Sequence, residues 1–158
     1  MRTKRFPPRD VKPDLKYGSS KVTKLINKVM KSGKKTVAQK QVYQALEIVK
    51  EKTKKNPVEV LEQVLDRIRP QIEVRSRRVG GASYQVPMPV IPRRASSLAI
   101  RWLVVEANKR PNKEYHSFAQ KLAAEILDIL NEQGGAINRR NTSHKMADAN
   151  KAFAHFRW

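Results

Sequence analysis

The chain has 158 residues and a formal net charge of +20, because 34 lysines and arginines outnumber 14 aspartates and glutamates. This length is typical of a single domain, and the absence of cysteine excludes disulfides and cysteine-ligated zinc sites. No apolar run reaches the roughly 18–20 residues of a membrane span, and residues 1–13 lack the apolar centre of a secretory signal.

The amino-terminal part of the sequence predicts an arm and three helices. Residues 1–18 are basic, contain three prolines and show no periodicity, which is typical of an extended segment that a partner orders. Apolar residues at helical spacing then predict helices from Ser19 or Ser20 to Gly33, from Lys35 to Lys52, and from the Asn56-Pro57 start signal to Pro70. The residues expected to face the core are Val22, Leu25, Ile26, Val29, Met30, Val37, Ala38, Val42, Ala45, Leu46, Val49, Leu61, Val64, Leu65 and Ile68.

The segment 71–92 is predicted to form a β-ribbon. Apolar and polar residues alternate on both sides of Gly80-Gly81, and these glycines supply the positive φ angles of a tight hairpin turn. Pro87 and Pro89 lack backbone donors, so the second strand cannot lie inside a larger sheet and an isolated ribbon is expected. Three arginines lie toward its tip and follow one acidic residue: Arg75, Arg77, Arg78 and Glu73.

A fourth and a fifth helix are predicted after the ribbon. The fourth begins at Pro92 and is apolar on most sides, which is typical of the central helix of a bundle. Arg110-Pro111-Asn112 ends this helix, and a fifth helix is expected from about Lys113 to Glu132, before Gly134-Gly135.

The last predicted helix is short. Three neighbouring polar residues are candidates for its N-cap: Asn141, Thr142 and Ser143. Met146 and Ala149 are expected to face the core, and aromatic residues occupy the tail. The predicted fold class is mainly α: a six-helix single-domain body with one protruding β-hairpin ribbon between helices three and four.

Positive charge is concentrated in parts of the chain. Residues 1–35 hold twelve lysines and arginines against two aspartates, residues 71–94 hold five arginines against one glutamate, and residues 136–158 hold five basic residues against one aspartate. Residues 114–132, by contrast, hold four acidic residues against Lys121. This segregation favours a nucleic-acid-binding face, although a basic stripe is in some proteins only a solvated surface.

RNA is favoured over DNA as the partner. No segment resembles a basic zipper, a zinc finger or a homeodomain recognition helix, while Tyr84 and the aromatic tail offer rings for stacking on unpaired bases. A ribbon also fits a DNA groove, so a DNA-compacting or regulatory protein is an alternative. An RNA-processing enzyme is a second alternative.

The sequence predicts no catalytic residue, metal ligand or cofactor. His116, His144 and His155 fit no metal spacing, and the last two are expected to make structural or RNA-facing hydrogen bonds. Gly33-Lys34-Lys35 lacks the remaining residues of a phosphate-binding loop, but its lysines suit phosphate contacts.

Several motifs together resemble one known family. They are Lys12-Pro13-Asp14, Tyr17-Gly18-Ser19, Gly33-Lys34-Lys35, IEVRSRRVGGASYQVP at 72–87, Arg101-Trp102-Leu103-Val104 and HKMADANKAFAHFRW at 144–158. In this order, over nearly the whole chain, they resemble protein seven of the small ribosomal subunit, of the bacterial and organellar type. The segment 108–117 is a few residues longer than is usual in that family.

The resemblance implies a structural constituent of the small ribosomal subunit, a primary binder of ribosomal RNA that nucleates assembly of the head, the 3′ major domain. Residues 1–18 would be a basic arm and residues 19–158 a helical RNA-binding domain. The ribbon would lie near the exit-site tRNA and the mRNA path.

The resemblance also implies partners and contact residues. Ribosomal proteins eleven and nine would be neighbours in a cytoplasmic or organellar ribosome, with no cofactor, membrane or homo-oligomer. The residues that it assigns to ribosomal RNA are Arg2, Lys4, Arg5, Lys34, Lys35, Arg75, Arg77, Arg78, Arg94, Asn150, Lys151 and Arg157. Those that it places near tRNA or mRNA are Gly80, Gly81 and Tyr84.

Overall fold

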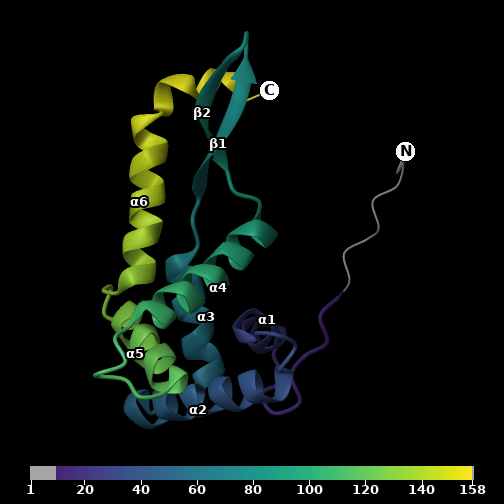
Figure 1. The fold of residues 1–158 in the computed structure, drawn as a ribbon, viewed down its shortest axis with the longest axis vertical. Coiled ribbons are helices and arrows are strands. Elements are labelled where there is room, and N and C mark those ends of the chain that lie inside the picture. Colours follow the sequence, from purple (N-terminus) through teal and green to yellow (C-terminus); the bar gives the residue numbers. More distant parts are fainter. Residues whose placement is uncertain (1–9, 158) are drawn as a thin grey trace.

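The computed structural model describes residues 10–157. Its elements are α1 (Ser20–Val29), α2 (Lys35–Thr53), α3 (Pro57–Ile68), β1 (Ile72–Val79), β2 (Ala82–Pro89), α4 (Pro92–Lys109), α5 (Phe118–Leu130), α6 (Gly135–Ala149) and the 3-10 helix η1 (Lys151–Phe156). Helices α1 to α5 pack into a body, and α6 and the β1–β2 hairpin extend from it side by side (Figure 1). The predicted mainly α fold, with a hairpin between the third and fourth helices, is confirmed.

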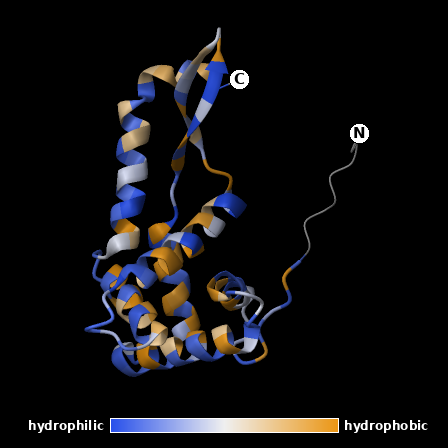
Figure 2. Cartoon of the chain, viewed as in Figure 1, coloured by the Kyte–Doolittle hydropathy of each residue, from blue (hydrophilic) through white to orange (hydrophobic). Residues whose placement is uncertain are grey.

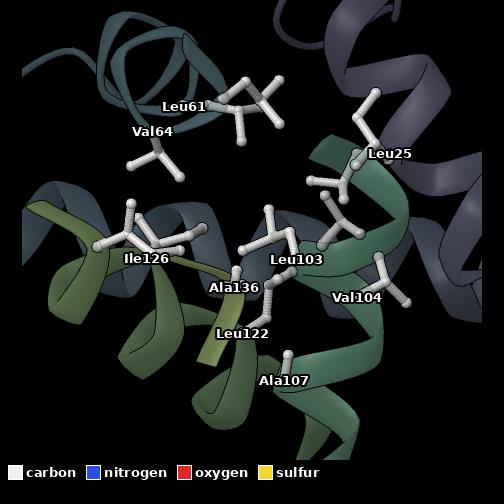
Figure 3. Packing of buried hydrophobic residues seen from close by; sticks show 14 of the residues in the cluster. Leu25, Leu61, Val64, Leu103, Val104, Ala107, Leu122, Ile126 and Ala136 are labelled. Atoms are coloured by element: carbon white, nitrogen blue, oxygen red, sulfur yellow. The ribbon is translucent and has the colours of Figure 1, made fainter. Parts of the chain in front are cut away.

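The core lies among the five body helices and the first turn of α6. In Figure 3 buried side chains from α1, α3, α4, α5 and α6 point toward one another. Leu103 and Ala107 of α4 are fully buried, and Trp102 on the same helix is 9% exposed, which confirms α4 as the central helix. Hydrophilic residues cover the outer surfaces of the helices and much of β1 (Figure 2).

Local caps set two of the helix starts as predicted. Ser19 Oγ accepts a hydrogen bond from Lys21 N at 3.3 Å before α1, and Asn56 Oδ1 accepts one from Val58 N at 3.1 Å before α3. The end of α1 differs from the prediction, because the helix stops at Val29 and the left-handed Gly33, with φ of +73°, lies in the connection that follows.

The structure corrects the starts of the last two α-helices. Helix α5 begins at Phe118 rather than near Lys113, because Ser117 and Gln120 form a reciprocal capping box. Helix α6 begins at Gly135 rather than at 141–143. Its cap comes from another helix: Glu125 Oε1 accepts a hydrogen bond from Ala136 N at 3.1 Å.

Three residues predicted to face the core are exposed. Val37 is 57% exposed and Met146 is 56% exposed, and Ala149 is exposed as well. The reason at Met146 and Ala149 is that α6 runs past the body and beside the hairpin (Figure 1), so only one side of the helix is covered there. Ala147 lies on the covered side and is buried, whereas Met146 and Ala149 lie outside it.

The hairpin has the predicted turn but is not isolated. Gly80 and Gly81 have φ angles of +57° and +91°, as a two-residue hairpin turn with left-handed central residues requires. Helix α6 packs against β1, and η1 packs against β2. The hairpin therefore has helical support along both of its strands.

Candidate nucleic-acid interface

The hairpin carries three of the arginines that the sequence singled out. Its antiparallel register pairs Arg77 with Tyr84. Because directly opposed residues share a face and side chains alternate along a strand, Arg75 lies on the face of Arg77 and Tyr84, and Arg78 lies on the other face. Arg75 and Arg78 are exposed, and Arg77 is half-buried. The hairpin therefore presents positive charge on both of its faces.

Glu73 orients two of the predicted arginines. It is only 8% exposed, and its carboxylate oxygens lie 2.5 Å from Arg75 Nη2 and 2.7 Å from Arg94 Nε. Both arginine side chains remain about half exposed, at 48% and 49%, and each guanidinium has five N–H donors. Each arginine therefore keeps donors for a phosphate, while Glu73 ties β1 to the first turn of α4.

The carboxy-terminal tail is fastened to the hairpin. The ring of Tyr84 has its centroid 5.3 Å from that of Phe153 and 5.2 Å from that of Phe156, and Arg157 Nε donates to Pro87 O at 2.7 Å. These aromatic rings, expected to stack on unpaired bases, pack against one another instead.

The predicted tail cations lie at the hairpin end of the molecule. Lys151 is exposed, and Arg157 is also exposed although its Nε is bonded to the β2 backbone. The side-chain amide of Asn150, the residue that follows α6, donates to Met146 O at 2.7 Å in the last turn of that helix. The tail thus adds two positive charges to those of the hairpin.

Replacing Phe153 and Phe156 by alanine is expected to loosen the hairpin selectively. Each aromatic pair contributes about 0.5–1.5 kcal/mol beyond its buried area, and a two-stranded hairpin alone is only marginally stable in water. Amide hydrogen exchange in β1 and β2 should become faster, while the amides of the body helices keep their protection. Lys151→Ala, an exposed change in the same segment, is the control. Unchanged hairpin exchange in the double variant would contradict a supporting role for the tail.

A second cationic surface lies between α1 and α4. Lys24 and Lys28 of α1 and Arg93 of α4 line a cavity of about 570 Å³. None of the three forms an ion pair with another residue in the range 10–157, although Asp10 also borders the cavity. These residues were not among the contacts predicted from the sequence. Two features of the sequence could have identified them. Lys24 and Lys28 are four residues apart and so lie on one helix face, and Arg93 stands beside Arg94.

The remaining predicted residues do not join the hairpin. Lys34 and Lys35 are exposed where α2 begins, and Figure 1 places α2 and the hairpin at opposite ends of the long axis. Arg2, Lys4 and Arg5 lie outside the described residues. The structure therefore divides the candidate contacts into a hairpin-and-tail group and an α2 group, with the cavity between α1 and α4 as a further cationic surface.

A network of ion pairs and hydrogen bonds around Arg110 supports α6. Arg110 Nη2 lies 2.6 Å from Glu125 Oε2 and also pairs with Asp128. Burial by itself lowers the pKa of Arg110, but the hydrogen bonds to Asp128 and Glu125 outweigh burial and raise that pKa above its usual range. Lys121 Nζ donates to Arg110 O at 2.5 Å. The network joins the end of α4 to α5, and through Glu125 to the start of α6.

Two of the histidines make structural contacts, as expected. His144 Nε2 accepts a hydrogen bond from Gln71 N at 3.2 Å, and His155 Nδ1 lies 2.9 Å from Ala152 O. Within residues 10–157 no group of three or more potential ligands is placed to hold a metal ion. No helix in that range is long and apolar enough to cross a membrane.

The fold and the cationic surfaces define a class of small, mainly helical proteins suited to a polyanionic partner. Residues 1–151 match the family model described as ribosomal protein S7p/S5e. The chain is 56% identical to the small ribosomal subunit protein uS7 of Moorella thermoacetica, over 98% of this chain and 97% of the relative. It is 55% identical to uS7 of Carboxydothermus hydrogenoformans, over 96% of both chains, and 53% identical to uS7 of Marinobacter nauticus, over 95% and 94%. The chain belongs to the ribosomal protein S7p/S5e family.

Membership of this family confirms three of the expectations. The family resemblance read from the motifs is correct, and the expected ribosomal location follows from it. The family consists of structural ribosomal proteins rather than enzymes, so the non-enzymatic interpretation also holds.

Proposed function

We propose that the chain is a structural constituent of the small ribosomal subunit that binds the ribosomal RNA of the head, the 3′ major domain, and helps to nucleate its assembly. The distribution of ion pairs carries this proposal. Among residues 10–157 the acidic side chains that form ion pairs are Glu73 in the hairpin and six in the helical body: Glu47, Glu62, Asp66, Glu106, Glu125 and Asp128. In the same range Arg78 of the hairpin forms no ion pair, and neither do the three cations beside the cavity between α1 and α4: Lys24, Lys28 and Arg93. These cations are therefore available for phosphates.

The hairpin and the arm extend this proposal to other partners. The hairpin projects beyond the body (Figure 1), so it reaches groups that the body surface does not, and we assign Gly80, Gly81 and Tyr84 to the vicinity of the exit-site tRNA and the mRNA path. Ribosomal proteins eleven and nine are the proposed protein neighbours. Residues 1–18 act as a basic arm on the RNA, and residues 19–158 are the RNA-binding domain. The last part of the arm is already held without RNA, because Asp14 and the ring of Tyr17 contact Tyr43 of α2.

The proposal is tested by comparing two nucleic acids. A transcribed 3′ major domain and a DNA duplex of equal length are each titrated with the full chain at about 150 mM salt, where non-specific binding is weak. Affinity for the RNA is expected to be at least about 100-fold higher, as for a specific rather than a non-specific site. Equal affinities would favour the DNA-compacting alternative and contradict the proposal.

A further inference from the structure

We propose, on the basis of the RNA-binding function above, that a pocket between α2 and α5 receives a single unstacked RNA base. The pocket has a volume of about 230 Å³ and lies at the opposite end of the molecule from the hairpin. Residues from α1, α2, the α1–α2 connection, α4 and α5 line it, and six of them carry the proposal: Val29, Val37, Phe118, Gln41, Asn108 and Lys34. We call it the base pocket.

Apolar side chains form the walls of the base pocket. Val29 and Phe118 are half-buried against the core, and Val37 is 57% exposed despite its place beside the buried stripe of α2. The volume is below the roughly 300–1,000 Å³ of pockets for drug-sized ligands, which suits one planar ring system. Bases extruded from single-stranded RNA are held in this way, with their faces against aromatic and aliphatic groups.

Two amide side chains in the base pocket have one unused polar atom each. Gln41 Oε1 accepts a hydrogen bond from Ala119 N at 3.1 Å; this bond sets the orientation of the amide and leaves the donor Nε2 without a partner among residues 10–157. Asn108 Nδ2 donates to Val104 O at 3.0 Å, which leaves the acceptor Oδ1 unused in the same way. A donor and an acceptor at one pocket match a base edge that offers an acceptor beside a donor, as adenine does at N1 and N6.

Positive charge at the rim distinguishes a nucleotide from a protein side chain as the occupant. Lys31 and Lys34 line the pocket and are exposed, and the first N–H groups of α2 are uncapped by any side chain. Both features favour the phosphate of the same nucleotide. An apolar side chain of a partner protein would leave these cations and both amide atoms unused.

The first test replaces one polar atom at a time. Gln41→Glu keeps an oxygen for Ala119 N but exchanges the donor for an acceptor, and Asn108→Ala removes the acceptor. Gln44→Glu makes the same charge change at an exposed position on α2 outside the pocket lining and is the matched control. Because Gln41→Glu loses one hydrogen bond to the base, we expect it to bind the 3′ major domain RNA about five- to tenfold more weakly than Gln44→Glu does. Asn108→Ala should weaken binding by a similar factor.

The outcomes separate this proposal from the one on which it rests. Equal affinities for Gln41→Glu and Gln44→Glu, together with unchanged binding by Asn108→Ala, would overturn the base pocket while leaving RNA binding intact. Failure of the unaltered chain to bind the RNA would overturn both proposals. Gln41→Glu should unfold at the same temperature as the unaltered chain, because the oxygen that accepts from Ala119 N is kept. Asn108→Ala should lower the melting temperature only slightly, because it loses one hydrogen bond to Val104 O.

A crosslinking test identifies the occupant directly. Because the chain contains no cysteine, Val37→Cys introduces a single thiol at the pocket, to which a short photoactivated aryl azide is attached. Glu51→Cys, about 20 Å further along the same helix by its rise per residue, is the control. In reconstituted small subunits the azide attached at position 37 should crosslink to an unpaired nucleotide. The azide attached at position 51 should not. Crosslinking of position 37 to a protein, or to a base-paired nucleotide, would overturn the proposal.

Discussion

Replacement of Arg75, Arg77 and Arg78 together by alanine is expected to flatten the salt dependence of RNA binding. Each phosphate contact contributes about 0.9 to the log–log slope for a duplex and about 0.7 for a single strand. Loss of three contacts would therefore reduce the slope by up to about two to three units, with the largest loss of affinity at low salt. Binding is measured between about 50 and 200 mM salt. Helical content by circular dichroism should not change, since the hairpin contributes little to the core.

Two further variants separate the hairpin from the effect of net charge. The combined replacement of Lys50, Lys52 and Lys55 by alanine removes the same charge from exposed positions in the last turn of α2 and just after it and should change the slope much less. The double variant Arg77→Ala with Arg78→Ala leaves both ion pairs of the buried Glu73 in place. An equal reduction in slope by the lysine and arginine triple variants would show that the hairpin makes no particular contribution.

Features with local causes could be predicted from the sequence. The hairpin is defined by the positive φ angles of Gly80-Gly81 and by the alternation of apolar and polar residues on either side of them. The start of α3 is defined by Asn56, which caps the helix, and by Pro57 in its first turn. The capping box of Ser117 and Gln120 was an equally local signal, and reading it would have placed the start of α5 correctly.

Features with long-range causes could not be predicted in the same way. The cap of α6 is a carboxylate from α5, so polar residues near the helix in the sequence do not mark where it begins, and the predicted start at 141–143 was too late. Glu73 interrupts the charge of the hairpin in the sequence, but its burial against Arg94 follows only from the packing of β1 near α4. Val37 lies one residue from the buried Ala38 on a helix, and its exposure depends on the pocket beside α5.

The candidate site shows the same division between local and long-range information. Clusters of arginine in one strand are visible in the sequence, so the hairpin was found. Lys24, Lys28 and Arg93 come together only because α1 packs against α4, and this pairing of helices is not encoded in either segment alone. Charge counts along the chain therefore located the basic segments, whereas the cavity between α1 and α4 could be found only from the three-dimensional structure.

Replacement of Glu125 by alanine is expected to lower the stability of the protein strongly. Glu125 is 2% exposed, and its carboxylate bonds both the guanidinium of Arg110 and the buried N–H of Ala136. Its removal leaves the partly buried guanidinium of Arg110 with Asp128 as its single acidic partner, and it leaves the N–H of Ala136 with no acceptor. Such losses lower the free energy of unfolding by about 3–5 kcal/mol, out of a total of about 5–15 kcal/mol for a typical domain. The melting temperature should fall by about 10 °C.

Two controls show whether this loss comes from the network. Glu125→Gln keeps an oxygen for Ala136 N but replaces the oxygen that accepts from Arg110 by an amide nitrogen, so it loses the ion pair, keeps the cap of α6, and should have a smaller effect than Glu125→Ala. Glu114→Ala removes an exposed acid and should have almost none. A melting temperature in Glu125→Ala equal to that of Glu114→Ala would contradict the role of the network. Because α6 supports β1 and leads into the tail, Glu125→Ala should also weaken RNA binding below its melting temperature. RNA binding at full strength there would mean that the hairpin keeps its orientation without an anchored α6.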